Sequence, residues 1–321
     1  MSEAPRRPPL RYHGGKWRLA PWVLAHFPDH RLYIEPFGGG ASVLMRKPRC
    51  YAEVYNDLDD EVVNVFRVLR DPLLAEALAR SCALTPFSRT EFIAAHKRDT
   101  VDPVEQARRA IVRSFFGFGS ASLHSANPRG MRARASEWKS GRGNESCASS
   151  PRGTGFRADA HKNGTTPAMD WSRWPSQVES FVDRLRGVII EHRDGLEVIR
   201  QHDREDALIY ADPPYPMSTR DDARPDYAHE MSDDDHRALA RVLREARGYV
   251  VLSGYPCELY DEQLYPHWTR LEREHRADGA KVRTEVLWLN PRCARALGMR
   301  VPDRAAPAIA SAADVFDFEA I

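Results

Sequence analysis

Long apolar runs are missing from this chain of 321 residues, which has no stretch of about eighteen apolar residues able to span a membrane. The amino terminus is polar and proline-rich and lacks the apolar core of a signal peptide. Net charge is nearly absent too, since 47 Lys and Arg balance 46 Asp and Glu. We therefore expect a soluble, cytoplasmic protein without a membrane partner. The overall charge does not by itself indicate a polyanionic ligand.

Cysteines are few, and the five present are scattered and form no C-x-x-C pair. Neither a disulfide framework nor a zinc site is predicted, and no metal is expected. Hydrophobic residues make up 42% of the chain, which is enough to build a globular core.

Short apolar runs alternate with helical patterns in two parts of the chain. The predicted strands share β-branched and aromatic residues and span 32–34, 51–55, 188–190, 207–211, 249–252 and 282–289. The predicted helices carry apolar residues on one face and span 41–45, 59–69, 176–186, 196–201 and 232–246. Such alternation predicts an α/β fold with a doubly wound, mostly parallel sheet.

A long insertion interrupts this alternation. Its first part is helical, with helix starts expected at Asp71, Ser88 and Asp102, and its second part is rich in Gly, Ser, Lys and Arg. We therefore predict three parts. Residues 1–70 and 175–297 form the core, residues 71–174 form a helical and loop insertion, and residues 298–321 form a mobile tail.

Polar and glycine clusters directly follow the predicted strands. They lie at Glu35–Gly40, Asn56–Asp57, Asp194 and Asp212–Tyr215. Because open parallel sheets bind ligands at the carboxyl ends of their strands, we expect these clusters to converge on one crevice. A glycine turn lets the backbone approach a bulky cofactor, and Asp57 suits the two hydroxyls of a ribose. Ordinary turns also contain such residues, so a structural role is the alternative.

The cluster at Asp212–Tyr215 is the most specific one. An acid, two prolines and an aromatic residue directly after a fully apolar strand predict a rigid platform that points outward. A proline turn that merely closes the strand is the alternative. We expect the active site here.

In type and order, these clusters resemble the motifs of the Dam-type (D12 class) DNA adenine-N6 methyltransferases, especially the phage and prophage members. The resemblance rests on Tyr12–Lys16, Glu35–Gly40, Tyr55–Asp57 and Asp212–Tyr215, with further similar stretches at 253–255, 259–261 and 285–290. It implies a Rossmann-like, S-adenosylmethionine-dependent methyltransferase that acts on double-stranded DNA as a monomer and releases S-adenosyl-L-homocysteine. The insertion would be its target-recognition domain.

The resemblance also implies which residues bind S-adenosylmethionine: Tyr12, Lys16, Glu35, Phe37, Gly38, Gly39, Gly40, Asp57, Asp194 and Asp212. For Lys16 the alternative is a solvated lysine at a helix start, and for Asp194 the cap of the following helix. The family's glycine loop usually reads Phe-x-Gly-x-Gly, whereas this chain ends it with Ala41. That change costs little as long as the backbone at Ala41 is not left-handed.

The implied catalytic residues are Asp212, Pro213, Pro214 and Tyr215. Adenine N6 is a poor nucleophile, so an enzyme has to align it with the methyl group and accept its hydrogens. Asp212 and the carbonyl of Pro213 suit the amino group. Tyr215 suits stacking on an adenine flipped out of the double helix, which costs about a few kcal/mol.

The basic part of the insertion lies where the family places target recognition. The candidate DNA-binding residues suit phosphates and guanine edges and are Arg129, Arg132, Arg134, Lys139 and Arg142. A solvated, charge-rich loop is the alternative. For the whole chain the alternatives are an RNA adenine methyltransferase and a catalytically silent DNA-binding relative. N4-cytosine methylation is disfavoured, because such enzymes usually begin the tetrapeptide with Ser.

Overall fold

The computed structural model describes residues 4–119, 123, 155–157, 165–220, 227–276 and 282–302. The chain forms two compact units, which are described separately. The sheet unit comprises residues 16–63, 187–225 and 229–321. The helical unit comprises residues 1–15, 64–186 and 226–228. The predicted domain boundaries at residues 70 and 175 stay a prediction.

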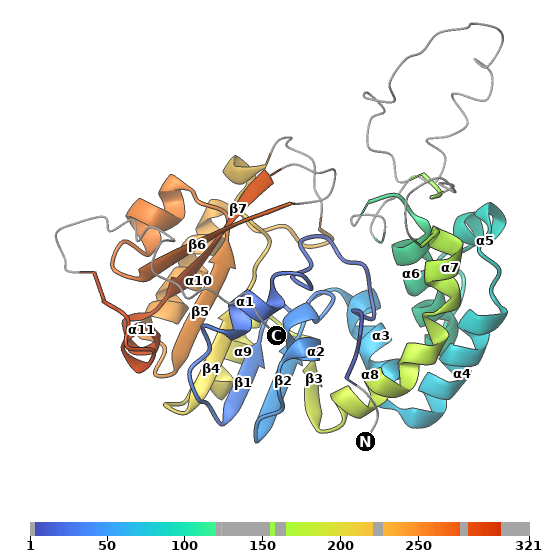
Figure 1. Cartoon of the computed structure of the whole chain (residues 1–321), viewed down its shortest axis with the longest axis horizontal. Helices are drawn as coiled ribbons and strands as arrows, with labels where there is room; N and C mark the ends of the chain where they lie inside the picture. Colours follow the sequence, from blue (N-terminus) through green and yellow to red (C-terminus); the bar gives the residue numbers. More distant parts are fainter. Residues whose placement is uncertain are drawn as a thin grey trace, which may run out of the picture. The chain divides into compact units, whose positions relative to one another are not determined.

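A seven-stranded sheet in the order β3-β2-β1-β4-β5-β7-β6 forms the centre of the sheet unit (Figure 1). The strands are β1 (Leu32–Glu35), β2 (Ala52–Asn56), β3 (Val188–Glu191), β4 (Ala207–Ala211), β5 (Tyr249–Gly254), β6 (Thr269–Arg276) and β7 (Val282–Leu289). The first five in this order are parallel, and β7 runs antiparallel to both of its neighbours. The predicted mostly parallel α/β sheet is confirmed.

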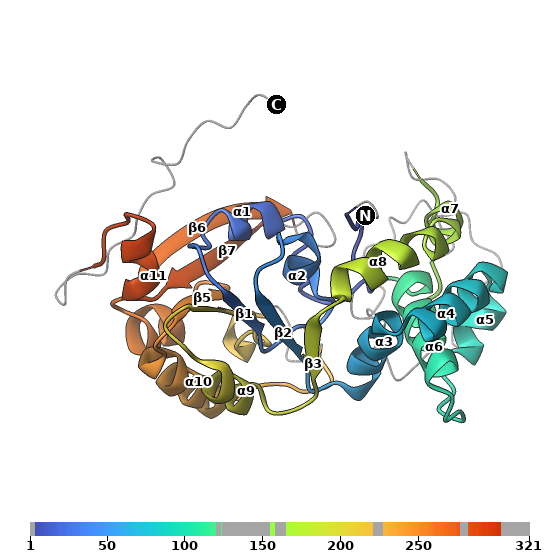
Figure 2. The ribbon, with the colours of Figure 1, turned by 90° about the horizontal axis from the view of Figure 1, so that it is seen from below.

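Helices cover both faces of this sheet. Figure 2 shows α9 (Gly195–His202) and α10 (Asp233–Glu245) on one face, and α1 (Ala20–Leu24) and α2 (Ser42–Arg46) on the other. All five residues of β4 are buried, which explains why its sequence is continuously apolar instead of alternating. Because β1 to β4 pair in parallel, their carboxyl ends meet at one edge of the sheet, as the sequence predicts.

The helical unit is built around four helices whose starts or patterns are visible in the sequence. They are α4 (Pro72–Leu84), α5 (Arg89–Ala94), α6 (Pro103–Phe116) and α8 (Val178–Leu185), and α7 (Pro167–Ser172) and the 3₁₀ turn η2 (Pro175–Gln177) complete the unit. Asp71, Ser88 and Asp102 each accept hydrogen bonds from the first turn of their helix, so the three predicted helix starts are confirmed.

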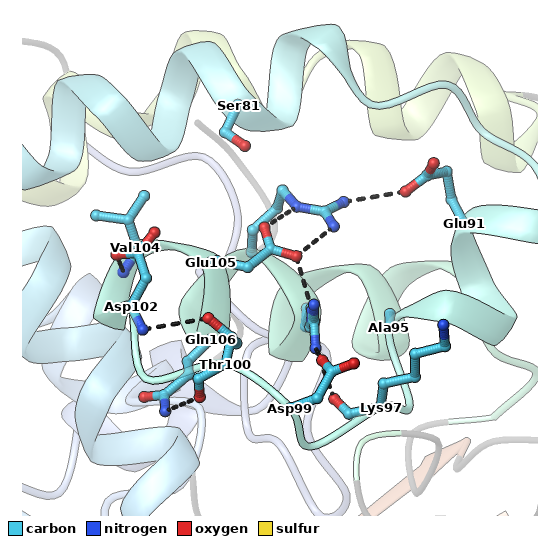
Figure 3. Close-up of polar contacts among 12 residues, drawn as sticks. Ser81, Glu91, Ala95, Lys97, Asp99, Thr100, Asp102, Val104, Glu105 and Gln106 are labelled. Carbon is cyan, nitrogen blue, oxygen red and sulfur yellow. Dashed lines mark hydrogen bonds and ion pairs between the residues drawn. The ribbon is translucent and has the colours of Figure 1, made fainter.

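An ion-pair network joins α5 and α6. The Glu105 carboxylate accepts from Arg108 Nε at 2.6 Å and from Arg109 Nε at 2.7 Å, while the two guanidinium groups also reach Glu91 and Asp99 (Figure 3). One carboxylate thus holds two arginines in fixed orientations on the surface of the helical unit.

The amino-terminal residues 4–11 belong to the helical unit and not to the sheet. The indole of Trp174 donates to the carbonyl of Pro9 at 3.0 Å, and the amide of Arg11 donates to Ser114 Oγ at 2.7 Å. The buried Leu10 lies between these two contacts. This segment is therefore fastened to its unit by both hydrogen bonds and apolar contact.

Some elements are not visible in the sequence. The strand β6 has a charged sequence with one aliphatic residue, Leu271, yet it pairs with β7 along its whole length. As an edge strand it is solvated on one side, so it lacks the apolar pattern of the inner strands. The short helices α1, α7 and α11 (Pro291–Ala296) and the π-helical turn η4 (Leu259–Leu264) were not predicted either.

None of the helices in the described part of the chain is long and apolar enough to cross a membrane. Of the predicted tail, only residues 298–302 are described.

Candidate active site

Asp57 closes the glycine loop that follows β1. Its Oδ2 accepts a hydrogen bond from the amide of Gly39 at 2.7 Å, and its Oδ1 accepts from the amide of Asp59 at 2.9 Å. Burial raises the pKa of Asp57 to about 6, although both backbone hydrogen bonds act in the opposite direction. Each carboxylate oxygen has two lone pairs, so Asp57 keeps capacity for further donors such as hydroxyls.

Two residues of the glycine loop adopt left-handed backbone conformations: Gly39 with a φ of 47° and Ala41 with a φ of 51°. They occupy the two glycine positions of the Phe-x-Gly-x-Gly pattern, which explains why that pattern requires glycine there. The condition under which Ala41 would cost little is therefore not met. A left-handed alanine costs about 1–2 kcal/mol, so this loop carries backbone strain.

Asn56 holds the loops after three strands together. Its amide Nδ2 donates to the carbonyls of Pro36 and Arg193, both at 2.9 Å, and its Oδ1 accepts from the amide of Arg193 at 3.0 Å. The side chain is fully buried. Asn56 was predicted only as part of a motif, and its tertiary partners show that it positions the site.

Phe37 and Asp194 are brought together at the start of α9. A Cβ on Gly195 would lie 3.1 Å from two ring atoms of Phe37, so glycine allows the close approach. Asp194 Oδ1 accepts from the amides of Leu196 and Glu197 at 2.9 and 3.1 Å. The alternative of Asp194 as a helix cap is therefore confirmed, and its predicted contact with a cofactor stays a prediction.

Glu35, another predicted cofactor residue, is buried at the end of β1. Its Oε2 accepts from the hydroxyl of Tyr33 at 2.8 Å and from the amide of Leu44 at 3.2 Å. The carboxylate thus ties β1 to the first turn of α2, where the positive end of the helix dipole stabilises its charge.

Lys16 and the tetrapeptide meet at the end of β4. Lys16 Nζ lies 2.9 Å from Asp212 Oδ1 and 4.9 Å from the centre of the Tyr215 ring. Only 5% of the Lys16 side chain is exposed, so the alternative of a solvated lysine is wrong. Asp212 keeps 18% of its side chain exposed and remains accessible to a ligand.

Glu285 on β7 completes this cluster and was not predicted as a site residue. Its Oε1 accepts from the hydroxyl of Tyr215 at 2.5 Å and from Ser253 Oγ at 2.6 Å, and it lies 3.6 Å from Lys16 Nζ. The available signal was an acid directly before the apolar run 286–289, within a stretch that also shares the family resemblance. Nothing local in the sequence points to its partners, which are 32 and 70 residues away.

The electrostatics of the cluster favour proton uptake by Asp212. Burial raises the pKa of Asp212 to about 6, Lys16 lowers it in part, and the negative charge of Glu285 raises it further. Burial also raises the pKa of Tyr215 well above its usual range, so that its hydroxyl stays protonated. The cluster therefore combines the accessible carboxylate of Asp212 with the buried carboxylate of Glu285, which holds the Tyr215 hydroxyl.

The other predicted residues are placed as follows in the described part of the chain. Tyr12 belongs to the helical unit, where its ring centre is 6.2 Å from that of Tyr227. Gly38, Gly40 and Pro213 are buried, and Pro214 is half-buried. The five candidate DNA-binding residues fall outside the described residues. Within the described ranges no group of three or more potential metal ligands is found.

A comparison with protein families identifies the first part of the chain. Residues 12–127 match the sequence model of the D12 class N6 adenine-specific DNA methyltransferases. The D12-class match confirms the family resemblance and supports adenine methyltransferase activity, while the phage-like character stays a prediction. The seven-stranded α/β sheet is consistent with a Rossmann-like methyltransferase fold.

The D12-class match includes Lys16, the glycine loop and Asp57, and it ends before the tetrapeptide at Asp212–Tyr215. No curated protein matches the sequence of the chain.

Proposed function

We propose that this protein is an S-adenosylmethionine-dependent methyltransferase that methylates N6 of a flipped adenine in double-stranded DNA. The observation that carries the proposal is the tetrapeptide cluster: a partly exposed Asp212 is fixed by Lys16 at the carboxyl end of β4, in a unit that also holds the glycine loop. A carboxylate held in this way suits an amino group that has to be oriented and to lose a proton.

The residues at the adjoining strand ends fit the cofactor. Asp57 offers carboxylate lone pairs to the ribose hydroxyls, and Phe37 offers an aromatic face beside the start of α9. Asp194, already a helix cap, presents its carboxyl group at the same place. S-adenosylmethionine would supply an electrophilic methyl group there, and Lys16, Glu35 and Gly38–Gly40 would complete its surroundings.

At the substrate, Asp212 and the carbonyl of Pro213 would accept hydrogen bonds from the N6 amino group. Lys16 and Tyr215 both contact Oδ1 of Asp212, and no hydrogen bond to Oδ2 is formed within the described ranges. Oδ2 is thus the oxygen for the amino group. Pro214 stiffens the turn, and Tyr215 would stack on the base and offset part of the cost of flipping it.

The insertion would contact DNA. Arg129, Arg132, Arg134, Lys139 and Arg142 would neutralise phosphates or read guanine edges, as their charge suggests. Affinity for DNA would then fall steeply as salt is raised.

The test is transfer of a labelled methyl group from S-adenosylmethionine to unmethylated duplex DNA, followed by digestion and separation of the nucleosides. We expect labelled N6-methyladenine from the wild type and none from Asp212→Ala. The matched control is Asp206→Ala, which removes a surface carboxylate before the other end of β4 and should leave transfer intact. Transfer to ribosomal RNA instead of DNA, or no transfer by folded protein that binds the cofactor, would overturn the proposal.

A further inference from the structure

Glu285 is buried deeply enough to be excluded from contact with a substrate. Its side chain is 2% exposed, whereas that of Asp212 is 18% exposed. Its neighbours nevertheless include Lys16 and Tyr215, which both contact the Asp212 carboxylate. Glu285 can therefore act on the reaction only indirectly, through these two side chains and through the effect of its charge on Asp212.

The Tyr215 hydroxyl lies between two carboxylates and carries a single hydrogen. It is 2.5 Å from Glu285 Oε1 and 3.2 Å from Asp212 Oδ1, so the shorter contact takes the hydrogen. Ser253 donates to the same oxygen of Glu285 at 2.6 Å, which fixes the carboxylate on the sheet. Glu285 thereby prevents the tyrosine from donating strongly to Asp212.

The Lys16 ammonium group, like the Tyr215 hydroxyl, is shared between the two carboxylates. Lys16 is the one cation that contacts both carboxylates among the described residues, at 2.9 Å from Asp212 and 3.6 Å from Glu285. The cluster of two acids and one ammonium group therefore carries a net negative charge when both acids are ionised. Asp212 feels the field of a second carboxylate that a substrate cannot reach.

We propose that Glu285 is a positioning residue of the active site, which holds the Tyr215 hydroxyl and the Lys16 ammonium so that Asp212 keeps one oxygen and its basicity for the adenine amino group. This inference rests on the proposed function. It assigns a role to a residue on β7 that lies outside the D12-class match and outside the tetrapeptide.

The titratable groups that act on the two carboxylates are Lys16, Tyr210, Tyr215, Tyr255 and Tyr260. His275 interacts with Lys16, and Arg283 lies over the ring of Tyr255. Burial raises the pKa of each of the four tyrosines, so they stay neutral. Burial and Lys16 lower the pKa of His275, so it is neutral in neutral solution. The charged side chains that act on the pKa of Asp212 are thus Lys16, which lowers it, and Glu285, which raises it.

The decisive variant is Glu285→Gln, which keeps the shape of the side chain and removes its charge. We expect kcat on duplex DNA to fall roughly 10- to 100-fold, because small misplacements of reacting groups cost up to about 100-fold. We also expect the acidic limb of the kcat profile to move to lower pH by about one unit, since Asp212 loses a neighbouring negative charge. A merely structural role would lower kcat without moving this limb.

Two further variants act as controls. Glu53→Gln removes another buried carboxylate that is paired with a lysine, Lys47 at 3.2 Å, and should leave kcat and the acidic limb unchanged. Ser253→Ala removes one hydrogen bond to Glu285 without removing its charge. It should lower kcat by a smaller factor and leave the limb in place.

The same shift can be measured without turnover. We expect a carbon-13 NMR titration of the Asp212 carboxyl group, in protein free of cofactor, to show a lower midpoint in Glu285→Gln than in the wild type. An unmoved midpoint and an unmoved limb would overturn the inference. If the wild type bound cofactor but methylated no DNA, the proposed function would fail, while the titration would still decide the role of Glu285. Should Glu285→Gln not fold, wild-type kcat in Ser253→Ala would overturn the inference.

Discussion

The ring of Tyr55 occupies the space that a side chain at Gly38 would need, since a Cβ on Gly38 would lie 2.1 Å from Cε2 of that ring. The hydroxyl of Tyr55 donates to the carbonyl of Gly39 at 2.7 Å. Tyr55, near the end of β2, thus requires glycine at position 38 and fixes the conformation of the loop after β1. The glycine run in this chain is a packing requirement as well as a backbone requirement.

Gly38→Ala should therefore destabilise the protein by about 1–3 kcal/mol, because a buried aromatic ring has to move. Chemical denaturation measures the loss, and we expect weaker binding of S-adenosyl-L-homocysteine in calorimetry. Gly298→Ala is the comparison for the binding measurement: its Cβ meets no atom within 4 Å, so it should cost only the about 1–2 kcal/mol of a left-handed alanine and leave the binding of S-adenosyl-L-homocysteine unchanged. A Gly38→Ala variant as stable as the wild type would contradict the packing argument.

Ala41→Gly tests the strain in the same loop. Relief of the left-handed alanine should outweigh the added chain entropy of glycine in the unfolded state, and the net gain in the free energy of unfolding should reach up to about 1 kcal/mol. The matched substitution Ala240→Gly, at another fully buried alanine but within α10, should instead cost about 1 kcal/mol. Equal losses in both variants would show that Ala41 is not strained.

Asp57 should give the protein a characteristic dependence on pH. Its pKa rises from an ordinary value of 3.8 to about 6 on folding, so the folded state binds a proton more tightly than the unfolded state does. The corresponding stability is present below about pH 4 and is lost as the pH rises through about 6, on the order of 1 kcal/mol for a partly exposed group. Asp57→Asn should flatten this part of the stability profile, as measured by denaturation at several pH values.

The same substitution should weaken the binding of S-adenosylmethionine, because the amide keeps one acceptor oxygen where the carboxylate has two. Asp59→Asn serves as the neighbouring control, since Asp59 caps the first turn of α3 (Asp60–Arg70) through the amides of Glu61 and Val62. Its effect should appear in stability and not in cofactor affinity. Unchanged affinity in Asp57→Asn would argue against the ribose contact.

Glu105→Gln should destabilise the helical unit, because it removes the charge that holds Arg108 and Arg109. Hydrogen bonds from the arginines lower the pKa of Glu105, so its contribution is present above its ordinary pKa and is lost as the pH falls through the lowered value. We expect a loss of about 1 kcal/mol that shrinks at high salt. Glu76→Gln on the exposed face of α4 is the control and should change stability little.

Much of the fold could be predicted because its signals are local. The strand β4 begins and ends where its apolar run does, and β7 ends with its apolar run. Asp71, Ser88 and Asp102 cap helices, as their positions before proline or acidic turns indicate. The edge strand β6 could not be found in this way, since its stability comes from pairing with β7 and not from its own pattern.

The sequence by itself determined the alternation of strands and helices, and with it the common edge at which Asp57, Asp194 and Asp212 follow their strands. Tertiary structure alone decided that Ala41 is left-handed and that Glu285 lies beside Tyr215. The physical reason is register: β7 pairs antiparallel with β5, with Gly254 opposite Val286, and this pairing brings Glu285 to the end of β5 beside the tetrapeptide. A hydrogen bond across 70 residues depends on such pairing, which no local pattern encodes.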